Sequence, residues 1–444
     1  MTELAGWGRV PVVRGDERLS EDLKTVCRGA VLTRGLGRSY GDASLPAQEG
    51  AAVAGTRFGN RLLAFDEVTG VLRAEAGLSL VQLEAFCRPK GWVSPVCPGT
   101  QWVTVGGMVA SDVHGKNHHV AGTFGEHVRA LRMLLADGRV FELSPDCEDP
   151  AERELFAATL GGMGLTGHIL EVEVQLSRVE SAWIHTEEEI ATGLADLVTR
   201  LRRASAEWPY TVAWVDSLTR GAHMGRGVVM KGRWATASEA PARAPEVKRR
   251  VPVPIELPGW VLGPLTVRAF DSVFYRSHAW RPKHGIVHPE TFFYPLDTLL
   301  HWNRLYGKQG FVQHQCVLPV DDGEEVVHRF FDTLTRFAGA SFLTVMKDCG
   351  PEGSGMISFP RPGLSVALDI PMRGERTQAL VDALNEHVLS VGGRVYLAKD
   401  ALTRPEHFRA MEPRLDAWNA IRRRWDPDGL LKSALSVRLL GDVR

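Results

Sequence analysis

The residues best suited to bind an anion lie in one loop, Arg34-Gly35-Leu36-Gly37-Arg38-Ser39-Tyr40-Gly41-Asp42. Its three glycines permit tight turns in which several backbone N–H groups point at one ligand, and its two arginines add positive charge beside them. The loop follows a short apolar stretch, Ala30-Val31-Leu32, that we expect to be extended. We therefore predict that this segment binds a phosphate-bearing cofactor.

A second glycine-rich region has the same character. It comprises Pro98-Gly99-Thr100 and Thr104-Val105-Gly106-Gly107, and it leads directly into the stretch Ser111 to His119. Tight glycine turns beside hydroxyl groups suit a pyrophosphate. Both regions are thus expected to contribute to one cofactor site.

Three histidines, His114, His118 and His119, follow this second region and raise the question of a metal site. No acidic residue or cysteine stands at a recognisable ligand spacing from them, so we expect no metal. His118 and His119 are interpreted as hydrogen-bonded or surface residues. His114 is the functional candidate because it ends the glycine-rich loop.

The segment Gly162-Met163-Gly164-Leu165-Thr166-Gly167 matches the GxGxxG pattern of dinucleotide-binding folds. That fingerprint must follow a strand and open a helix. Here Glu152 to Leu160 has a helical pattern, and His168 to Leu176 alternates like a strand, so the order is reversed. We do not expect a Rossmann NAD site, although these glycines can bring the backbone close to another cofactor.

Length, charge and cysteine usage restrict the class of protein. A chain of 444 residues is too long for one compact core, and its net charge of −1 argues against nucleic-acid binding. Its six cysteines form no CxxC pair, which favours reduced thiols over disulfides. We see no signal peptide and no apolar run of the ~18–20 residues that span a bilayer, so we expect a cytoplasmic or peripheral membrane location.

The order of the expected elements indicates an α+β fold. Strands are expected at 62–65, 71–76, 131–135, 139–143, 168–176 and 364–368, and helices at 79–86, 152–160 and 324–337. The first strands are too closely spaced for repeated βαβ crossovers. Asp137-Gly138 is a hairpin turn pattern.

The ordered set of glycine-rich loops and later segments resembles the flavin domain of the vanillyl-alcohol-oxidase superfamily. More closely, it is similar to the decaprenylphosphoryl-ribose 2-oxidase family, the oxidising half of a sugar 2-epimerase. The likeness spans nearly the whole chain and continues through Gly161 to Gly167, Phe293-Tyr294-Pro295-Leu296-Asp297, Trp302-Asn303-Arg304, Gly310 to Gln315, and Tyr396-Leu397-Ala398-Lys399-Asp400.

This resemblance implies a two-domain α+β flavoprotein. A PCMH-type FAD-binding domain would occupy residues 1–181, and a substrate domain with helices on an antiparallel sheet would occupy 182–393. Residues 394–444 would return to the FAD domain. The resemblance further implies that FAD is bound by Thr33, Arg34, Gly35, Leu36, Gly37, Arg38, Ser39, Tyr40, Gly41, Asp42, Ala43, Gly99, Thr104, Val105, Gly106, Gly107, Ser111, Asp112, Val113, His114, Ile169 and Tyr396.

Several flavoproteins of this superfamily tether FAD through a histidine in the first loop. This chain has Tyr40 in that neighbourhood and no histidine between Thr33 and Asp42. We therefore expect FAD to be bound noncovalently.

The family pattern places Lys399, His114, Gln313 and Gln315 around the reacting sugar as catalytic residues, with Lys347, Tyr40 and Ala367 as substrate-binding residues. Lys399 would orient the hydroxyl group, stabilise negative charge on the reduced flavin, or act as a base if desolvated. Gln313 and Gln315 stand two apart in a strand-like run and should face the same side, whether toward a sugar or toward solvent.

At the position of Ala367, well-studied mycobacterial members of the family carry a cysteine beside the flavin. A small apolar residue still suits a pocket wall, so the oxidation chemistry is not threatened. The departure leaves no thiol there for covalent inhibition.

The stretch Lys248 to Trp260 mixes basic and apolar side chains with prolines. One interpretation is a mobile surface loop, and the other is a lid that meets a lipid-linked substrate at a membrane.

The resemblance implies FAD-dependent oxidation of the 2-hydroxyl of a polyprenyl-phosphoryl ribofuranose to a ketone. A separate NAD(P)H-dependent short-chain reductase would complete epimerisation to the arabinose form, as in the arabinan of a cell wall. Two alternatives stay open: an alditol or aldonolactone-type oxidase acting on a soluble sugar or secondary metabolite, and a non-catalytic flavin-binding partner subunit.

Overall fold

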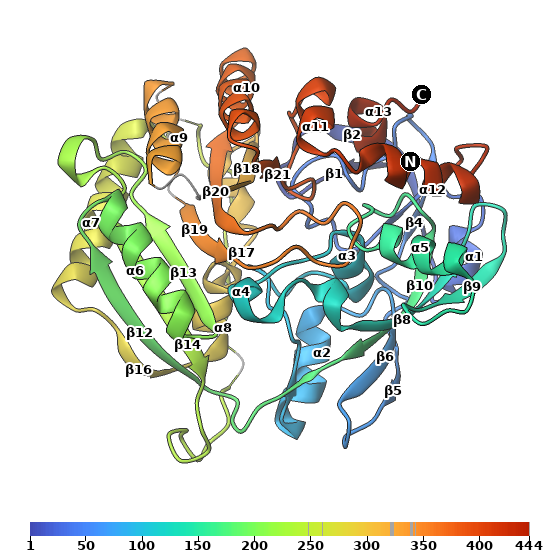
Figure 1. Cartoon of the computed structure of the whole chain (residues 1–444), viewed down its shortest axis with the longest axis horizontal. Helices are drawn as coiled ribbons and strands as arrows, with labels where there is room; N and C mark the ends of the chain where they lie inside the picture. The colour runs from blue at the N-terminus through green and yellow to red at the C-terminus, as the bar shows by residue number, and fades with distance from the viewer. Residues whose placement is uncertain (247, 260, 320–323, 338–340, 342, 444) are drawn as a thin grey trace.

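Short strands between residues 2 and 175 form two sheets, which lie in the right half of Figure 1. The computed structural model describes residues 1–246, 248–259, 261–319, 324–337, 341 and 343–443. A mixed sheet has the order β1-β2-β4-β3, from β1 (Thr2–Ala5), β2 (Val12–Leu19), β3 (Leu32–Arg34) and β4 (Ala52–Gly55). An antiparallel sheet has the order β5-β6-β10-β8-β9, from β5 (Leu62–Phe65), β6 (Val71–Glu75), β8 (Val128–Leu134), β9 (Val140–Leu143) and β10 (His168–Gln175).

Helices and connections complete this first unit. They are α1 (Leu23–Cys27), α2 (Leu80–Cys87), α3 (Val105–Ala110), α4 (His118–Ala121), α5 (Pro150–Thr159), the 3₁₀ turns η1 (Arg88–Lys90) and η2 (Phe124–His127), and the strand pair β7 (Trp92–Val93) and β11 (Ser177–Arg178). A capping box between Ser79 and Gln82 starts α2, because each residue's side chain bonds the other's backbone N–H. The expected hairpin is confirmed: β8 and β9 are antiparallel neighbours, and Gly138 adopts a φ of 87° in the turn.

The second unit, in the left half of Figure 1, is built on one larger sheet with the order β16-β12-β14-β13-β19-β20-β18-β21. All of its pairings are antiparallel, which confirms the expected sheet. Its strands are β12 (Ile184–Ala191), β13 (Tyr210–Val215), β14 (Gly227–Trp234), β16 (His284–Val287), β18 (Phe311–Leu318), β19 (Thr344–Cys349), β20 (Gly363–Pro371) and β21 (Arg394–Val395).

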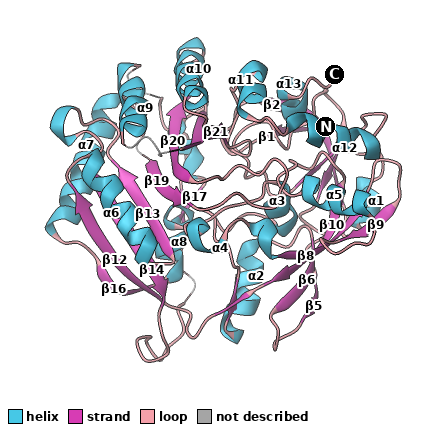
Figure 2. Cartoon of the chain, in the orientation of Figure 1, coloured by secondary structure: helices cyan, strands magenta, loops and turns pink. Residues whose placement is uncertain are grey.

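The other elements of the second unit are mostly helical (Figure 2). They are α6 (Leu194–Glu207), α7 (Pro264–Trp280), α8 (Pro289–Phe293), α9 (Glu325–Arg336), α10 (Glu375–Ser390), η3 (Gly221–His223), η4 (Pro295–Thr298), η5 (Trp302–Tyr306), and the parallel pair β15 (Val251–Pro252) and β17 (Leu299–Leu300). The tail adds α11 (Pro405–Met411), α12 (Leu415–Trp425) and α13 (Ala434–Leu439).

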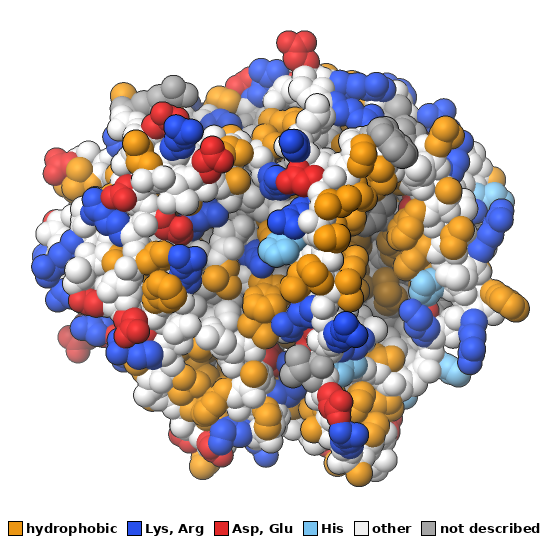
Figure 3. Space-filling model, turned by 180° about the vertical axis from the view of Figure 1, so that it is seen from behind, with side chains coloured by type: hydrophobic (Ala, Val, Ile, Leu, Met, Phe, Trp, Pro, Cys, Tyr) orange, Lys and Arg blue, Asp and Glu red, His pale blue; other side chains and the backbone are white. Residues whose placement is uncertain are grey.

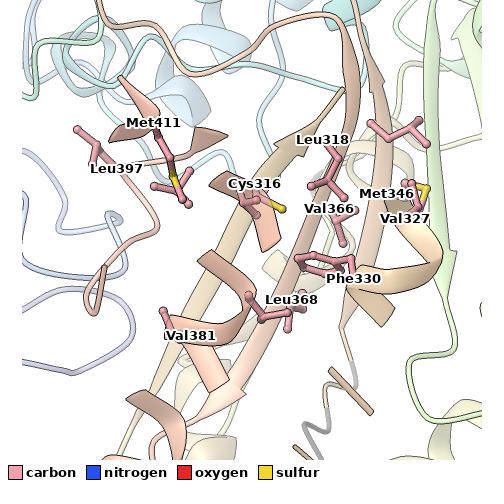
Figure 4. Close-up of a cluster of buried hydrophobic side chains, with 14 of the residues drawn as sticks. Cys316, Leu318, Val327, Phe330, Met346, Val366, Leu368, Val381, Leu397 and Met411 are labelled. Atoms are coloured by element: carbon pink, nitrogen blue, oxygen red, sulfur yellow. The ribbon is translucent and has the colours of Figure 1, made fainter. Parts of the chain in front are cut away.

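One face of the large sheet is buried under helices, and the other is available for a site. Figure 4 shows Phe330 of α9 and Val381 of α10 packed near Cys316 and Leu368 of β18 and β20. Because successive side chains of a strand point to opposite faces, the residues between these core positions face the opposite way. Gln313 and Gln315 therefore share a face, as predicted.

The tail connects the two units. Its β21 pairs with β18 in the large sheet, whereas α12 packs on α5, where the Trp418 indole N–H donates to the carbonyl of Ala158 (2.8 Å). The large sheet thus extends past residue 393, because β21 begins at Arg394. The division into 1–181, 182–393 and 394–444 stays a prediction.

The described part of the chain contains no helix with both the length and the apolar character to cross a membrane.

Candidate active site

A cavity of about 550 Å³ lies where the first unit, the open face of the large sheet and the start of the tail meet. Both glycine-rich regions line it, and so do Met163 and Gly164 of the segment with the misleading GxGxxG pattern. That segment joins the end of α5 to the start of β10, in the order expected from the sequence. It therefore contributes backbone to the wall without forming a dinucleotide-binding turn.

The loop after β3 is held against the N-terminus and the tail. The Tyr40 N–H donates to the carbonyl of Ala398 (2.9 Å), and the carbonyl of Tyr40 accepts from the Gly8 N–H (3.0 Å). The Arg38 guanidinium lies 4.0 Å from the centre of the Trp7 ring, and its Nε is buried with no hydrogen-bond partner. A buried donor without a partner on a cavity wall is suited to receive an anionic ligand.

The second glycine-rich region lines the same cavity and touches the first loop, since a Cβ on Gly35 would stand 2.6 Å from Oγ1 of Thr104. Thr104 caps α3 by accepting from the Gly107 N–H (3.1 Å), and Gly106 lies so close to Ala76 that a Cβ would stand 2.7 Å from its methyl group. Gly99 has open space where a side chain would be, with no heavy atom within 4 Å. The backbone of this region is thus exposed to the cavity, and the wall fits the phosphate-bearing cofactor expected from the sequence.

Most residues predicted to bind FAD line this cavity. They are Thr33, Gly35, Leu36, Gly37, Arg38, Ser39, Tyr40, Ala43, Gly99, Thr104, Gly106, Gly107, Ser111, Val113, His114, Ile169 and Tyr396.

The remaining predicted residues support the wall from behind. Asp42 accepts two hydrogen bonds from Arg438 (both 2.8 Å), and Asp112 accepts from the Gly125 N–H (2.8 Å). Arg34 donates to the carbonyl of Ala5 (2.7 Å). The other two are Val105, which is buried in the core, and Gly41, whose Cα faces the carbonyl of Asp400.

His114 is at the centre of a buried polar cluster. Its Nε2 is 2.9 Å from Nε2 of Gln315, and its Nδ1 is 3.2 Å from Nζ of Lys347. Burial, reinforced by the positive charges nearby, holds the pKa of His114 well below its usual range, so the ring is neutral. A neutral imidazole accepts at one nitrogen and donates from the other, so only one of these neighbours can donate to it at a time.

Lys399 lies half-buried beside this cluster. Its Nζ lies 4.0 Å from the centre of the Tyr40 ring, in cation–π geometry. Burial lowers the pKa of Lys399, the carboxylate of Asp369 opposes that shift, and Lys347 adds to it. Asp369 is fully buried and accepts hydrogen bonds from the Gln313 amide and from the Tyr306 hydroxyl (3.3 Å).

Two further lysines line the cavity. Lys116 donates to the carbonyl of Phe292, and burial lowers its pKa to about 7. Burial lowers the pKa of Lys347 to about 8. Such values place both amines close to the point at which they gain or lose a proton near neutral pH, as is common at functional sites.

The structure brings the predicted catalytic and substrate-binding residues together: Lys399, His114, Gln313, Gln315, Lys347, Tyr40 and Ala367 all line the cavity. Ala367 stands opposite Gln315 on the neighbouring strand, and is 6% exposed. His118 and His119 are hydrogen-bonded, to the Gly350 N–H (3.0 Å) and the carbonyl of Trp208 (2.9 Å), as interpreted from the sequence.

Asp369 and Lys116 were missed by the sequence reasoning. Asp369 is a carboxylate within the mostly apolar run Leu364 to Ile370. Because charged residues are rare inside buried strands, this position could have been singled out as a candidate functional residue. Lys116 stands two residues after His114, at the end of the second glycine-rich region.

Comparisons with known proteins identify relatives of the chain. A family model described as an FAD binding domain matches residues 21–144. The chain is 36% identical to the decaprenylphosphoryl-beta-D-ribose oxidase of Mycolicibacterium smegmatis over 454 residues, which cover 98% of this chain and 97% of that protein. It is 35% identical over 373 residues to an uncharacterized protein in the mprA 5′ region of Streptomyces coelicolor, covering 82% of this chain and 100% of that protein. A D-lactate dehydrogenase of Archaeoglobus fulgidus is 31% identical over 113 residues, which cover 26% of this chain and 25% of that protein.

Proposed function

Because the chain belongs to the family of decaprenylphosphoryl-beta-D-ribose oxidases, we propose that it oxidises the 2-hydroxyl of a polyprenyl-phosphoryl ribofuranose to the 2-keto sugar. It is an FAD-dependent oxidoreductase. The observation that carries the proposal is that one cavity is lined by both glycine-rich regions, by three lysines and by apolar residues of β13, β14 and α7.

Oxidation of a secondary alcohol removes a hydride from carbon and a proton from oxygen. FAD, when bound, supplies the hydride acceptor. The proton must pass to a group of the chain or to water, and the half-buried Lys399 and the buried His114 are bases on the cavity wall. The amides of Gln313 and Gln315, on one face of β18, are positioned to hold sugar hydroxyls.

The charge of the cluster supports a phosphate-bearing substrate. Three lysine side chains, Lys116, Lys347 and Lys399, line the same cavity, which a phosphodiester would enter with negative charge. In a water-poor site such charges interact much more strongly than in bulk water. A soluble, uncharged polyol would form hydrogen bonds with these lysines but no ion pair.

The outer wall supports a lipid-linked substrate rather than a soluble one. It is formed by Val212 and Trp214 of β13, Met230 of β14, and Phe270 and Phe274 of α7. An isoprenoid chain buries apolar surface on such a wall at about 25 cal/mol per Å².

A second enzyme is required if the product is the epimer. Oxidation removes the stereochemistry at the carbon, and a hydride must then return to the opposite face. We propose that an NAD(P)H-dependent short-chain reductase takes this role as the partner of the chain, since the chain itself belongs to an FAD-dependent oxidase family.

The test is anaerobic mixing of the flavin-loaded protein with polyprenyl-phosphoryl ribose, with free alditols, and with aldonolactones. We expect the first to bleach the flavin absorbance. Bleaching by a free alditol or aldonolactone alone would support the soluble-sugar oxidase, and bleaching by none of them would support the non-catalytic subunit.

A further inference from the structure

Helix α7 has one face in the cavity and another in solvent. Val267, Asp271 and His278 are buried on the inner side. On the outer side, Leu265, Val273 and Trp280 are 82%, 69% and 93% exposed. Spacings of seven and eight residues, about two helical turns, place these three on one side of the helix.

Positive charge accompanies this apolar stripe. Between Lys248 and Lys283 the sequence has seven lysines and arginines but only two carboxylates, in a chain whose net charge is −1. Glu256 is paired with Arg9 (2.7 Å) and Asp271 is buried. Two of the seven cations are paired elsewhere, Arg250 with Glu290 (3.7 Å) and Lys283 with Glu188 (4.0 Å). The exposed cations on the helix itself are Arg268 and Arg276. Arg268, Arg276 and the stripe defined above form what we call the α7 face.

The segment 248–257 precedes α7 in the chain and is fastened to the fold. The Val253 N–H donates to the carbonyl of Leu300 (2.9 Å), and the Leu257 N–H donates to that of Arg304 (3.0 Å). Val251 and Ile255 are nonetheless 54% and 65% exposed. The stretch suggested by the sequence as a loop or lid is thus held in place, apart from Trp260, which lies outside the described residues.

Helix α7 also forms part of the cavity wall. Phe270, Phe274 and His278 of α7 line the cavity, and Leu262, just before the helix, packs against the cluster of Trp302, which also lines it. Figure 3 shows the molecule from behind, with hydrophobic side chains gathered around a hollow in the half that contains α7. A lipid chain leaving the cavity would therefore emerge beside the α7 face.

We propose that the α7 face docks on an anionic lipid bilayer. The cations match anionic headgroups, and the exposed leucine, valine and tryptophan insert at the interface, as in basic amphipathic helices that lie on membranes. A second copy of the chain is a poor occupant, because two such faces would bring like charges together. Binding to the bilayer is argued from the α7 face itself. Only the identity of the lipid-linked sugar that the bilayer would deliver rests on the proposed function.

The test is flotation of the flavin-loaded protein with vesicles of phosphatidylcholine alone or mixed with phosphatidylglycerol. We expect the wild type to float with the mixed vesicles and to be released by high salt. The variants Val273→Ser/Trp280→Ser and Arg268→Glu/Arg276→Glu should each reduce the bound fraction at least tenfold. Val68→Ser is the matched control, since Val68 is 88% exposed on a turn of the first unit.

Flavin content and melting temperature establish that each variant is folded. Failure of the wild type to float with anionic vesicles would overturn the proposal, as would equal flotation of all variants. A change of solution mass from dimer to monomer in the Val273→Ser/Trp280→Ser variant would assign the face to a second copy instead. Flotation requires no substrate, so a protein that floats but whose flavin no sugar bleaches would retain the docking surface and lose the proposed function.

Discussion

Asp369→Asn is expected to move the pH dependence of the reaction toward acid. Asp369 is the carboxylate that opposes the lowering of the Lys399 pKa by burial. Burial also raises the pKa of Asp369, to about 7, so its charge is fully present only on the alkaline side of neutrality. At an effective dielectric constant of ~20, two unit charges in a protein attract each other by a few kcal/mol at close range, and about 1.4 kcal/mol corresponds to one pKa unit. Neutralising Asp369 removes this attraction, so the ammonium form of Lys399 becomes less stable.

The assay is the rate of flavin reduction by substrate, measured by rapid anaerobic mixing across a range of pH. If Lys399 acts as an ammonium, the rate falls as pH rises through its pKa, and the variant loses activity near neutral pH. If Lys399 acts as a base, the rate rises with pH instead, and the variant is faster than wild type on the acid side. In both cases the pH at which the rate changes moves down by about one unit or more. Whether the rate falls or rises with pH identifies the role of Lys399.

Asp297→Asn is the control for this experiment. Asp297 is also a buried carboxylate on the cavity wall, but it accepts hydrogen bonds from Thr100 and from the Gln101 N–H (both 2.8 Å). Neutralising Asp297 should leave the pH at which the rate changes where it is in the wild type. The same pH in the folded, flavin-loaded Asp369→Asn variant, or a movement toward alkaline pH, would refute the coupling of Asp369 to Lys399.

Three other outcomes are expected. Lys399→Ala should retain FAD, measured by its absorbance after gel filtration, but lose substrate-driven flavin reduction; reduction at the normal rate would remove Lys399 from the mechanism. Acid-precipitated protein should release its yellow colour, since no histidine stands in the first loop; colour in the washed pellet would indicate a covalent bond. Arg438→Ala should lower the free energy of unfolding by about 3–5 kcal/mol in denaturant titrations, because it leaves the buried carboxylates of Asp42 and Asp400 unpaired; a change below 1 kcal/mol would contradict this.

The glycine-rich walls could be predicted because their chemistry is local. Tight turns and backbone donors depend on a few successive residues, as in Arg34 to Asp42 or around Gly106 and Gly107. The same holds for the capping box at Ser79 and the hairpin at Asp137-Gly138. In each case the sequence neighbours are also the neighbours in space.

The cluster around His114 could not be predicted from such local patterns. Gln315 and Lys347 reach the ring from separate strands of the second unit, and Lys399 comes from the tail. Their meeting depends on the sheet order β19-β20-β18, which places residues far apart in sequence on one face. The resemblance to a family supplied these residues; periodicity and spacing alone did not.

Burial of several lysines in one cavity is unfavourable for folding, which is an argument that the arrangement serves function. A lone buried ammonium is costly unless a partner compensates it. Lys399 has the Tyr40 ring and Asp369, and Lys116 has the carbonyl and ring of Phe292, yet burial still lowers the pKa of both amines. A fold selected for stability alone would place apolar side chains at these positions. These partners offset only part of the cost of burying each amine. The amines therefore have pKa values near neutral pH, as required of groups that exchange protons or attract an anionic ligand.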